Sequence, residues 1–333
     1  MKIIYHGYNT CCQNSTGGVQ LRLRKIASLV EKRGVEVELF NPFETKIKRG
    51  DILHIFMATP ENFNLIQYMK RRGVKVVIST IVNLCDAKKL SLYKSIRKLP
   101  VFTPYKMVRL DLQVADFLIT ESQKESAFLK KYYGIDLNNT QIIPNGVDVD
   151  DYDGPEIWEK LGKQCTYVLQ VGRFDANKNQ LNVIKALKNT DVDVVFIGGP
   201  GNEAYYTKCR EEAKEASNIH FLGWCESGSA LLRSAYAHAD SVILPSFDET
   251  FGLTAIEGGM KGAKILFSNT LPIVDYPVFS ECRKFSPNSI AEIRKTVEES
   301  IRDEKNPSLR QNVIRTFNWD SIIDSHLAIY NRI

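Results

Sequence analysis

The sequence predicts an α/β protein built from two doubly wound parallel-sheet domains. Short apolar segments alternate along the chain with longer segments whose apolar residues recur at helical spacing. Such alternation is typical of parallel strands joined by helices. A chain of 333 residues is also long for a single hydrophobic core. We therefore expect two domains with a cleft between them, and ligands outside the carboxyl ends of the strands.

The first half of the chain alternates strand and helix from its start. Residues 19–32 follow a glycine pair and carry Leu23, Ile26 and Val30 at helical spacing, and Gly34 ends that helix. Strands are expected at residues 2–5, 35–40, 52–56, 74–80 and 117–120. Residues 1–150 are therefore predicted to form the first domain.

A second series of strands follows the acidic stretch 144–155, which contains Gly and Pro and is the predicted linker. Strands are expected at residues 167–171, 194–197, 219–221, 241–244 and 264–267. Their apolar residues are consecutive, as in strands that are buried on both faces. This series predicts a second parallel sheet.

The charge distribution and the cysteine content limit the kinds of partner and the cellular compartment that are compatible with this sequence. Residues 1–150 hold 23 Lys and Arg against 14 Asp and Glu, a balance of +9, whereas the remainder holds 21 against 25, a balance of −4. Such an asymmetry suggests different partners for the two halves. The seven cysteines are odd in number and form no C-x-x-C pair, which favours a reducing compartment and disfavours a structural zinc site. Neither a signal peptide nor an apolar stretch of about eighteen residues is visible.

Two carboxylates, Glu249 and Glu257, stand eight residues apart around Phe251, Gly252 and Leu253. The spacing places Glu249 in a loop and Glu257 about one turn inside the following helix. Between them lie the free N–H groups of the first helical turn, which bind anions. This combination suits a ligand that is half phosphate and half polyol, such as a nucleotide-sugar. The alternative is an ordinary amphipathic helix with a glutamate near its start.

Two glycine-containing turns supply further candidates. Gly172 follows a predicted strand directly, and Arg173 and Lys178 bracket the next few residues. Two cations there can neutralise a diphosphate, most effectively as charge develops on a departing one; solvated surface charges are the alternative. Gly17 and Gly18 open the first helix, whose free N–H groups are a second anion site. No G-x-G-x-x-G and no G-x-x-x-x-G-K-[ST] occurs, which disfavours NAD and ATP.

Taken in order, these segments resemble glycosyltransferase family 4, whose members are retaining enzymes of the GT-B fold. The matching segments are Gly17-Gly18-Val19, residues 33–37, residues 144–148, Val171-Gly172-Arg173 with Lys178, residues 219–224 and residues 245–257. Residues 317–320 leading to Tyr330 resemble the closing helix of the family, which crosses back onto the first domain. The resemblance implies two Rossmann-like domains. Residues 1–150 with a helix at about 318–333 would bind the acceptor, and residues 151–317 would bind the nucleotide-sugar donor.

The resemblance also implies roles for individual residues. Arg173 and Lys178 would hold the donor diphosphate and stabilise it as a leaving group. Glu249 would contact the donor sugar near its anomeric carbon, and Glu257 would accept the ribose hydroxyls. The remaining donor-binding candidates are Gly17, Gly18, Phe251, Gly252, Leu253, Thr254, Trp224 and Cys225. No metal and no cofactor is implied, because the cations and the helix N-terminus take their place.

One departure from the family concerns the acceptor side. Many members carry a histidine after the strand predicted at residues 74–80, and this sequence has none there. Asn83 and Asp86 are candidates for that position, since either side chain can hydrogen-bond a sugar hydroxyl, and His6 is a third candidate. The departure keeps two alternatives open: another GT-B enzyme, such as a nucleotide-sugar epimerase, and a non-catalytic nucleotide-sugar-binding partner.

Residues 88–109 are strongly basic. They contain seven lysines and arginines, no acidic residue, and interleaved apolar side chains. Such a segment suits an anionic membrane surface or a lipid-linked acceptor, although an ordinary surface helix has the same pattern. No stacking platform for nucleic acid is evident. We expect a cytoplasmic protein, or one peripheral at the inner membrane face, that transfers a hexose-type sugar to a glycan or glycolipid acceptor, as in polysaccharide biosynthesis.

Overall fold

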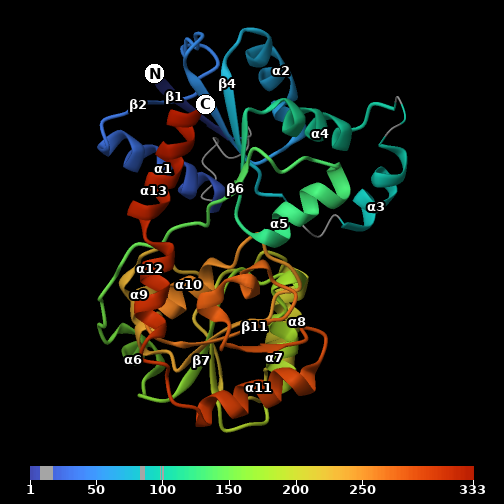
Figure 1. The fold of residues 1–333 in the computed structure, drawn as a ribbon. Coiled ribbons are helices and arrows are strands. Elements are labelled where there is room, and N and C mark those ends of the chain that lie inside the picture. Colours follow the sequence, from blue (N-terminus) through green and yellow to red (C-terminus); the bar gives the residue numbers. More distant parts are fainter. Residues whose placement is uncertain (8–17, 83–86, 98, 100) are drawn as a thin grey trace. The chain divides into compact units, whose positions relative to one another are not determined.

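The computed structural model describes residues 1–7, 18–82, 87–97, 99 and 101–333, with only the backbone for residues 87–89. The described residues fall into two compact units. Met1–Gly146 and Trp319–Ile333 form the first unit, and Val147–Asn318 forms the second. Each unit contains a six-stranded sheet whose pairings are all parallel, with helices on both faces (Figure 1). The two parallel sheets that the sequence predicted are therefore present.

The sheet of the first unit has the strand order β2-β1-β3-β4-β5-β6. Its strands are β1 (Lys2–Gly7), β2 (Glu36–Leu39), β3 (Ile52–Phe56), β4 (Lys75–Ser79), β5 (Phe117–Thr120) and β6 (Thr140–Ile142). β1 is paired with both β2 and β3, so the direction of winding reverses between β1 and β3. The edge strand β6 was not predicted.

Alternate residues of these strands enter two cores on opposite faces of the sheet. Ile4 belongs to one core, and its neighbours Ile3 and Tyr5 belong to the other. The helical segments of this unit are α1 (Gly18–Lys32), η2 (Pro60–Asn62), α2 (Phe63–Arg71), α3 (Ala87–Ile96), α4 (Pro104–Val114), α5 (Gln123–Phe128), η4 (Leu129–Tyr133) and α13 (Trp319–Arg332). α1 buries the predicted apolar positions and packs against α13 on the Tyr5 face.

The sheet of the second unit has the strand order β12-β11-β10-β7-β8-β9. Its strands are β7 (Tyr167–Val171), β8 (Asp193–Ile197), β9 (Ile219–Phe221), β10 (Ser241–Leu244), β11 (Lys264–Ser268) and β12 (Arg283–Phe285). The chain winds outward from β7 through β8 and β9, then returns to place β10 on the other side of β7. Winding in both directions from a central strand is the arrangement of doubly wound nucleotide-binding sheets.

Helices cover both faces of the second sheet as well. Leu169 lies in the core beneath α6, α9, α10 and α12, and its neighbour Val168 lies in the core beneath α7, α8 and α11. The helical segments are α6 (Glu156–Leu161), η5 (Ala176–Lys178), α7 (Gln180–Leu187), α8 (Glu203–Glu212), α9 (Ala230–His238), α10 (Leu253–Met260), η6 (Pro272–Asp275), η7 (Pro277–Phe279), α11 (Ile290–Arg302) and α12 (Leu309–Phe317). Across the described residues, none of the helices is both long enough and apolar enough to cross a membrane.

Tyr330 of α13 attaches the last helix to the first sheet. Its hydroxyl lies 2.6 Å from Nδ1 of His54 and 2.9 Å from the hydroxyl of Tyr5. Nε2 of His54 lies in turn 2.9 Å from Oγ of Ser79. All four side chains are buried, so a lost partner would leave a polar group with neither protein nor water to bond.

Burial lowers the pKa of three imidazoles in this unit. The pKa of His6 falls to about 4, that of His326 to about 3, and that of His54 well below the usual 6.5. Because these folded-state values lie below the unfolded value, the unfolded chain binds more protons as the pH falls. The stability of the first unit should therefore be fully present above pH 6.5 and decline as the pH drops toward the folded-state values.

We expect His326→Gln to flatten the acid limb of the stability profile. Each buried neutral histidine should steepen the fall in unfolding free energy by about 1.4 kcal/mol per pH unit between roughly pH 6 and pH 4, and the variant loses one such contribution. Urea unfolding at a series of pH values measures the slope. Tyr5→Phe is the matched control, because its hydroxyl bonds Tyr330 rather than a histidine, so this variant should lower stability at every pH without changing the slope. An unchanged slope in His326→Gln would contradict the expectation.

Candidate functional site

The predicted donor residues of the second unit gather at the carboxyl edge of its sheet. β7 is paired with β8 on one side and with β10 on the other. The connections that follow β7 and β10 therefore leave in different directions, and ligands of open α/β sheets bind where such connections diverge. Arg173 and Lys178 follow β7, while Glu249 and Glu257 follow β10.

Close backbone packing shapes the loop that follows β7. Gly172 and Gly198 have φ values of +151° and +157°, in a region that favours glycine. A Cβ atom on Gly198 would lie 2.0 Å from the carbonyl oxygen of Gly172, so no side chain fits there. The loops after β7 and β8 are thus in direct backbone contact.

Lys178 and Glu249 form an ion pair at this edge. Nζ of Lys178 lies 2.6 Å from Oε1 of Glu249, and the hydroxyl of Ser246 donates to the same oxygen over 2.7 Å. The side chains of Lys178 and Glu249 are only 25% and 16% exposed, which strengthens their attraction relative to a surface pair. The structure therefore joins two residues that the sequence analysis had assigned to separate parts of the ligand.

Two asparagines that the sequence analysis missed hold the two loops together. The side-chain amide of Asn177 donates to the carbonyl oxygen of Asp248 over 2.8 Å and accepts from its N–H over 3.1 Å. Buried Asn179 donates to the carbonyl oxygens of Pro245 and Pro287 over 3.0 and 2.8 Å. Their position beside Lys178 was the only available signal, because the bonds join segments far apart in the sequence.

Arg173 has a different environment. Its side chain is 76% exposed, and its guanidinium lies 3.9 Å from the carboxylate of Asp175. The amide of Gln180 fixes the backbone beneath it by donating to the carbonyl oxygen of Arg173 over 2.8 Å. A fixed backbone with an accessible guanidinium suits a cation that reaches out to a ligand.

The predicted helix begins at the expected place. α10 starts at Leu253 after Gly252, whose φ is +115° and which offers no side-chain cap. Neither Leu253 nor Thr254 is acidic, so the first turn can receive an anion. Phe251 points away from this turn: its ring is buried and packs against core aromatics. Phe251 can therefore offer a ligand only its backbone.

Glu257 lies one turn inside α10, as predicted, and has a partner on α9. The hydroxyl of Tyr236 donates to Oε2 of Glu257 over 2.5 Å. Burial raises the pKa of both groups, while the hydrogen bond partly offsets the shift at the carboxylate. Tyr236 fixes one carboxylate oxygen. A buried tyrosine on an amphipathic helix resembles any core residue, so this contact could not be predicted from the sequence.

Trp224 and Cys225 follow β9 at the same edge. The N–H of Gly198 donates to the carbonyl oxygen of Gly223 over 2.8 Å, which brings the loops after β8 and β9 together. Trp224 is exposed beside Gly199, and burial raises the pKa of the half-buried Cys225 thiol. An exposed indole offers a flat apolar face, whereas a protonated thiol is a poor nucleophile.

The candidates of the first unit are only partly described. Gly17, Asn83 and Asp86 lie outside the described residues. Gly18 is the first residue of α1, and His6 is buried near the carboxyl end of β1. No described residue hydrogen-bonds Nδ1 of His6. With its pKa lowered to about 4 by burial, the imidazole is neutral at pH 7 and a weak base.

Residues 88–109 form two helices rather than one. α3 buries Leu90 and Tyr93, and α4 begins after Thr103, whose hydroxyl caps it. Arg97 and Arg109 donate to the carbonyl oxygens of Tyr132 and Tyr133 in η4, so both arginines have a structural role. The side chains of Lys88, Lys89 and Lys98 lie outside the described part.

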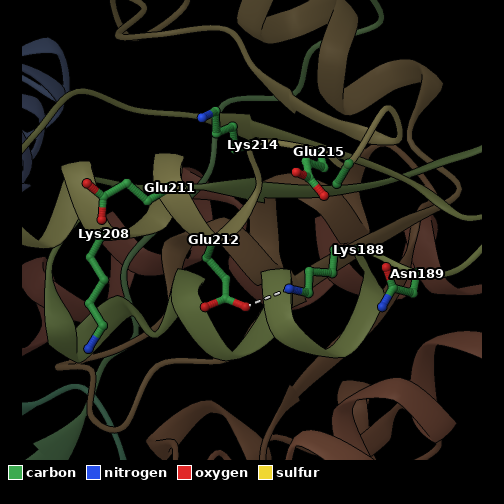
Figure 2. Close-up of a pocket in the computed structure, with 8 residues that line it drawn as sticks. Lys188, Asn189, Lys208, Glu211, Glu212, Lys214 and Glu215 are labelled. Atoms are coloured by element: carbon green, nitrogen blue, oxygen red, sulfur yellow. Dashed lines mark hydrogen bonds and ion pairs between the residues drawn. The ribbon is translucent and has the colours of Figure 1, made fainter.

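Among the described residues, no three His, Cys, Asp or Glu side chains gather as metal ligands. A pocket of about 600 Å³ lies where α7 and α8 end, at the opposite edge of the sheet. Figure 2 shows its charged lining, in which Lys188 pairs with Glu212 at 2.8 Å. Its lysines and glutamates are equal in number, so it has no evident preference for a charged ligand.

Several curated proteins are similar to part of this chain. "D-rhamnosyltransferase WbpZ" of Pseudomonas aeruginosa is 35% identical over 140 residues, which are 39% of this chain and 35% of that protein. The chain spans between 35% and 56% of the length of the first curated relatives that it matches.

Two solved structures match the chain along almost its whole length. Sucrose-phosphate synthase from Thermosynechococcus elongatus has a TM-score of 0.78 at 16% identity, covering 99% of this chain and 98% of its own. Anabaena Alr3699/HepE in complex with UDP and glucose has a TM-score of 0.73 at 18% identity, covering 100% of both chains. They confirm the predicted GT-B fold. Residues 156–316 match the family model "Glycosyl transferases group 1", so the chain has glycosyltransferase relatives and its second unit matches that family over nearly all its length.

Proposed function

We propose that this protein is a metal-independent, retaining glycosyltransferase. It transfers a hexose-type sugar from a nucleoside-diphosphate sugar, bound by the second unit, to a glycan or glycolipid acceptor, bound by the first. The observation that carries the proposal is the ion pair between Lys178 and Glu249. It links the loops that follow the paired strands β7 and β10, and the second of these loops leads into α10. Relatives named as glycosyltransferases, and the UDP and glucose of the Anabaena structure, support the same reaction class.

The cations and the helix start suit a diphosphate. Lys178 is held by Glu249 at the sheet edge, and Arg173, which also follows β7, is exposed. The first turn of α10 adds backbone N–H groups and the positive end of a helix dipole. Charge develops on the departing diphosphate during transfer, so these groups stabilise the transition state more than the bound donor. They supply the electrostatic role that a divalent cation has in other transferases.

The two glutamates suit the polyol parts of the donor. One oxygen of Glu257 is fixed by Tyr236, which leaves the other to accept from ribose hydroxyls. Oε1 of Glu249 accepts from Lys178 and Ser246, which fixes the carboxylate and leaves its other oxygen to accept from a sugar hydroxyl. The exposed ring of Trp224 lies on a neighbouring loop and is available to the base.

We also propose that α3 and the segment after it contact an anionic membrane. Leu92 and Phe102 are 70% and 62% exposed, and Leu99 and Val101 are exposed between them. These four residues and the exposed Lys94 are called the basic–apolar surface. Figure 1 shows α3 at the periphery of the first unit. An apolar patch beside cations fits the boundary between lipid headgroups and acyl chains.

Local charge balance favours this partner. The carboxylates within the described part of residues 87–135 are all withdrawn from solvent or paired. Asp111 and Glu125 are buried, Asp116 pairs with Lys70, and Glu121 pairs with Arg22. In η4, which packs against α3, Lys130 and Lys131 are exposed. Within residues 87–135, no described carboxylate therefore offsets the exposed lysines of α3 and η4.

We expect one family of nucleoside diphosphates, among UDP, GDP, ADP and TDP and their sugars, to raise the thermal unfolding temperature. The shift should persist without magnesium and disappear in Glu257→Gln, because a charge-assisted bond of about 1.5–3 kcal/mol is lost. Differential scanning fluorimetry measures it, with Glu298→Gln, which affects a carboxylate paired with Arg294 on α11, as control. A shift that requires magnesium would contradict metal independence. Conversion of the donor sugar without acceptor would indicate an epimerase instead.

Lys178→Ala should lower kcat for sugar transfer about 100-fold or more, since a group that stabilises the leaving diphosphate is removed. Steady-state assays with the donor identified by thermal shift measure the change. Lys188→Ala is the matched control, because Lys188 forms a similar 2.8 Å pair with Glu212 at the other edge of the sheet. Equal kcat values for the two variants would contradict the proposed role of Lys178.

Flotation with vesicles tests the membrane contact. The protein should float with vesicles of phosphatidylcholine and phosphatidylglycerol, but not with phosphatidylcholine alone. Lys94→Glu should reduce binding by about five-fold or more, and Leu92→Ser combined with Phe102→Ser should do the same. Phe43→Ser, at another exposed aromatic residue of the same unit, is the control. If the protein binds neutral vesicles as well as anionic ones, or if the double variant binds anionic vesicles as well as the wild-type protein does, the proposal is contradicted.

A further inference from the structure

The first unit carries unusual backbone conformations at the ends of two neighbouring strands. Met57 follows β3 with a φ of +75°, and Ile81 follows β4 with a φ of +41°. Neither is a glycine, and Ile81 is β-branched, so both conformations are strained. Such strain persists only where surrounding contacts enforce it, and it concentrates at functional sites. β3 and β4 are paired, so the two strained residues lie at the same carboxyl edge.

Hydrogen bonds hold these two strand ends together. The N–H of Met57 donates to the carbonyl oxygen of Ser79 over 2.9 Å, and that of Ala58 donates to Thr80 over 2.8 Å. The Ile81 side chain is buried in the core on the Tyr5 face. The backbone must therefore turn sharply at Ile81 before it continues to Val82.

Glu125 of α5 binds the far side of this turn. Its Oε1 accepts the hydroxyl of Thr80 over 2.6 Å and the N–H of Val82 over 3.0 Å. Its Oε2 accepts the N–H of Glu121, at the end of β5, over 2.6 Å. One buried carboxylate thus joins the ends of β4 and β5 and brackets the strained Ile81.

Helix capping alone does not explain this arrangement. Ser122 and Glu125 have the S-x-x-E spacing of a capping box, and the Ser122 hydroxyl accepts the N–H of Glu125 over 3.1 Å. A capping glutamate bonds a backbone N–H at the start of its own helix. The bond from the N–H of Glu121 to Oε2 of Glu125 is local in this way, so capping can account for Oε2 but not for Oε1. Oε1 is directed to a different strand end. Burying a carboxylate there is unfavourable, and burial raises its pKa to about 7 even though Thr80, Val82 and Arg22 favour the charged form.

We propose that Glu125 is a positioning residue that fixes the turn Thr80–Val82 for acceptor binding. This inference rests on the proposed transferase function, since only that function gives the first unit an acceptor. The turn lies at the carboxyl edge of the sheet, where His6 lies near the end of β1 and where ligands of such sheets bind. Glu125 itself need not touch the acceptor, because it acts through the backbone of the turn.

Hydrogen exchange tests the positioning without any activity. In Glu125→Gln one acceptor oxygen becomes an N–H donor, so at least one bond from Thr80, Val82 or Glu121 is lost. Measured well above pH 7, where the wild-type carboxylate is ionised, exchange in peptides covering residues 80–82 and 118–122 should accelerate about ten-fold or more. Glu292→Gln, which affects another carboxylate bonded to a backbone N–H, should leave these peptides unchanged. Unchanged exchange in Glu125→Gln would overturn the proposal.

Steady-state kinetics then distinguish a positioning role of Glu125 from a general disruption of the structure. With octyl glycosides as acceptor probes, Glu125→Gln should lower kcat/KM for the acceptor about ten-fold, while the donor KM stays within two-fold. Thr80→Val, which removes only the hydroxyl partner, should act in the same direction and is the second variant if Glu125→Gln does not fold. Equal losses in kcat/KM for the donor and for the acceptor would indicate that Glu125 has only a structural role, and would overturn the proposal. If the wild-type protein transfers to no glycoside, the transferase function fails, whereas the exchange result still decides whether Glu125 holds the turn.

Discussion

The pairing of β7 with β10 is the contact on which the candidate site depends. Leu169 of β7 lies opposite Val242 of β10, although the two residues are separated by β8, β9 and four helical segments along the chain. Because these two strands are adjacent and parallel, the loops that follow them, which carry Lys178 and Glu249, begin side by side at the same edge of the sheet. Asn177 then bonds one loop to the other. Charge, helix dipole and hydrogen-bonding groups therefore meet where no single segment of sequence contains them all.

Sequence patterns identified most of the fold because buried parallel strands are continuous apolar runs. The strands Ile52–Phe56 and Tyr167–Val171 have the predicted bounds. β6 and β12 were missed because they are three-residue edge strands with polar and exposed positions, and they lack an apolar run. Their places are defined by the neighbouring strand rather than by their own composition.

The candidate site was predictable to a similar degree. The spacing of Glu249 and Glu257 correctly placed one in a loop and the other inside a helix, because a helix start is locally encoded. Tyr236 was not predictable, because its partner lies on another helix. In the basic segment, the sequence could not distinguish Arg97, which holds a backbone carbonyl, from Lys94, which is exposed. A local sequence pattern shows which residue types occur at which spacing. Only tertiary contacts show which charged side chains bond other parts of the protein and which face solvent.

The attachment of α13 to the first sheet affects the order in which the chain can fold during synthesis. The second unit is one continuous segment, Val147–Asn318, and all its contacts can form once that segment has left the ribosome. The first unit emerges earlier but lacks the hydroxyl of Tyr330, which is 325 residues from its partner Tyr5. Until then His54 and the Tyr5 face of the sheet have no cover from α13. The unit whose synthesis begins first is therefore completed only after the second unit has been made, when α13 becomes available to cover the Tyr5 face.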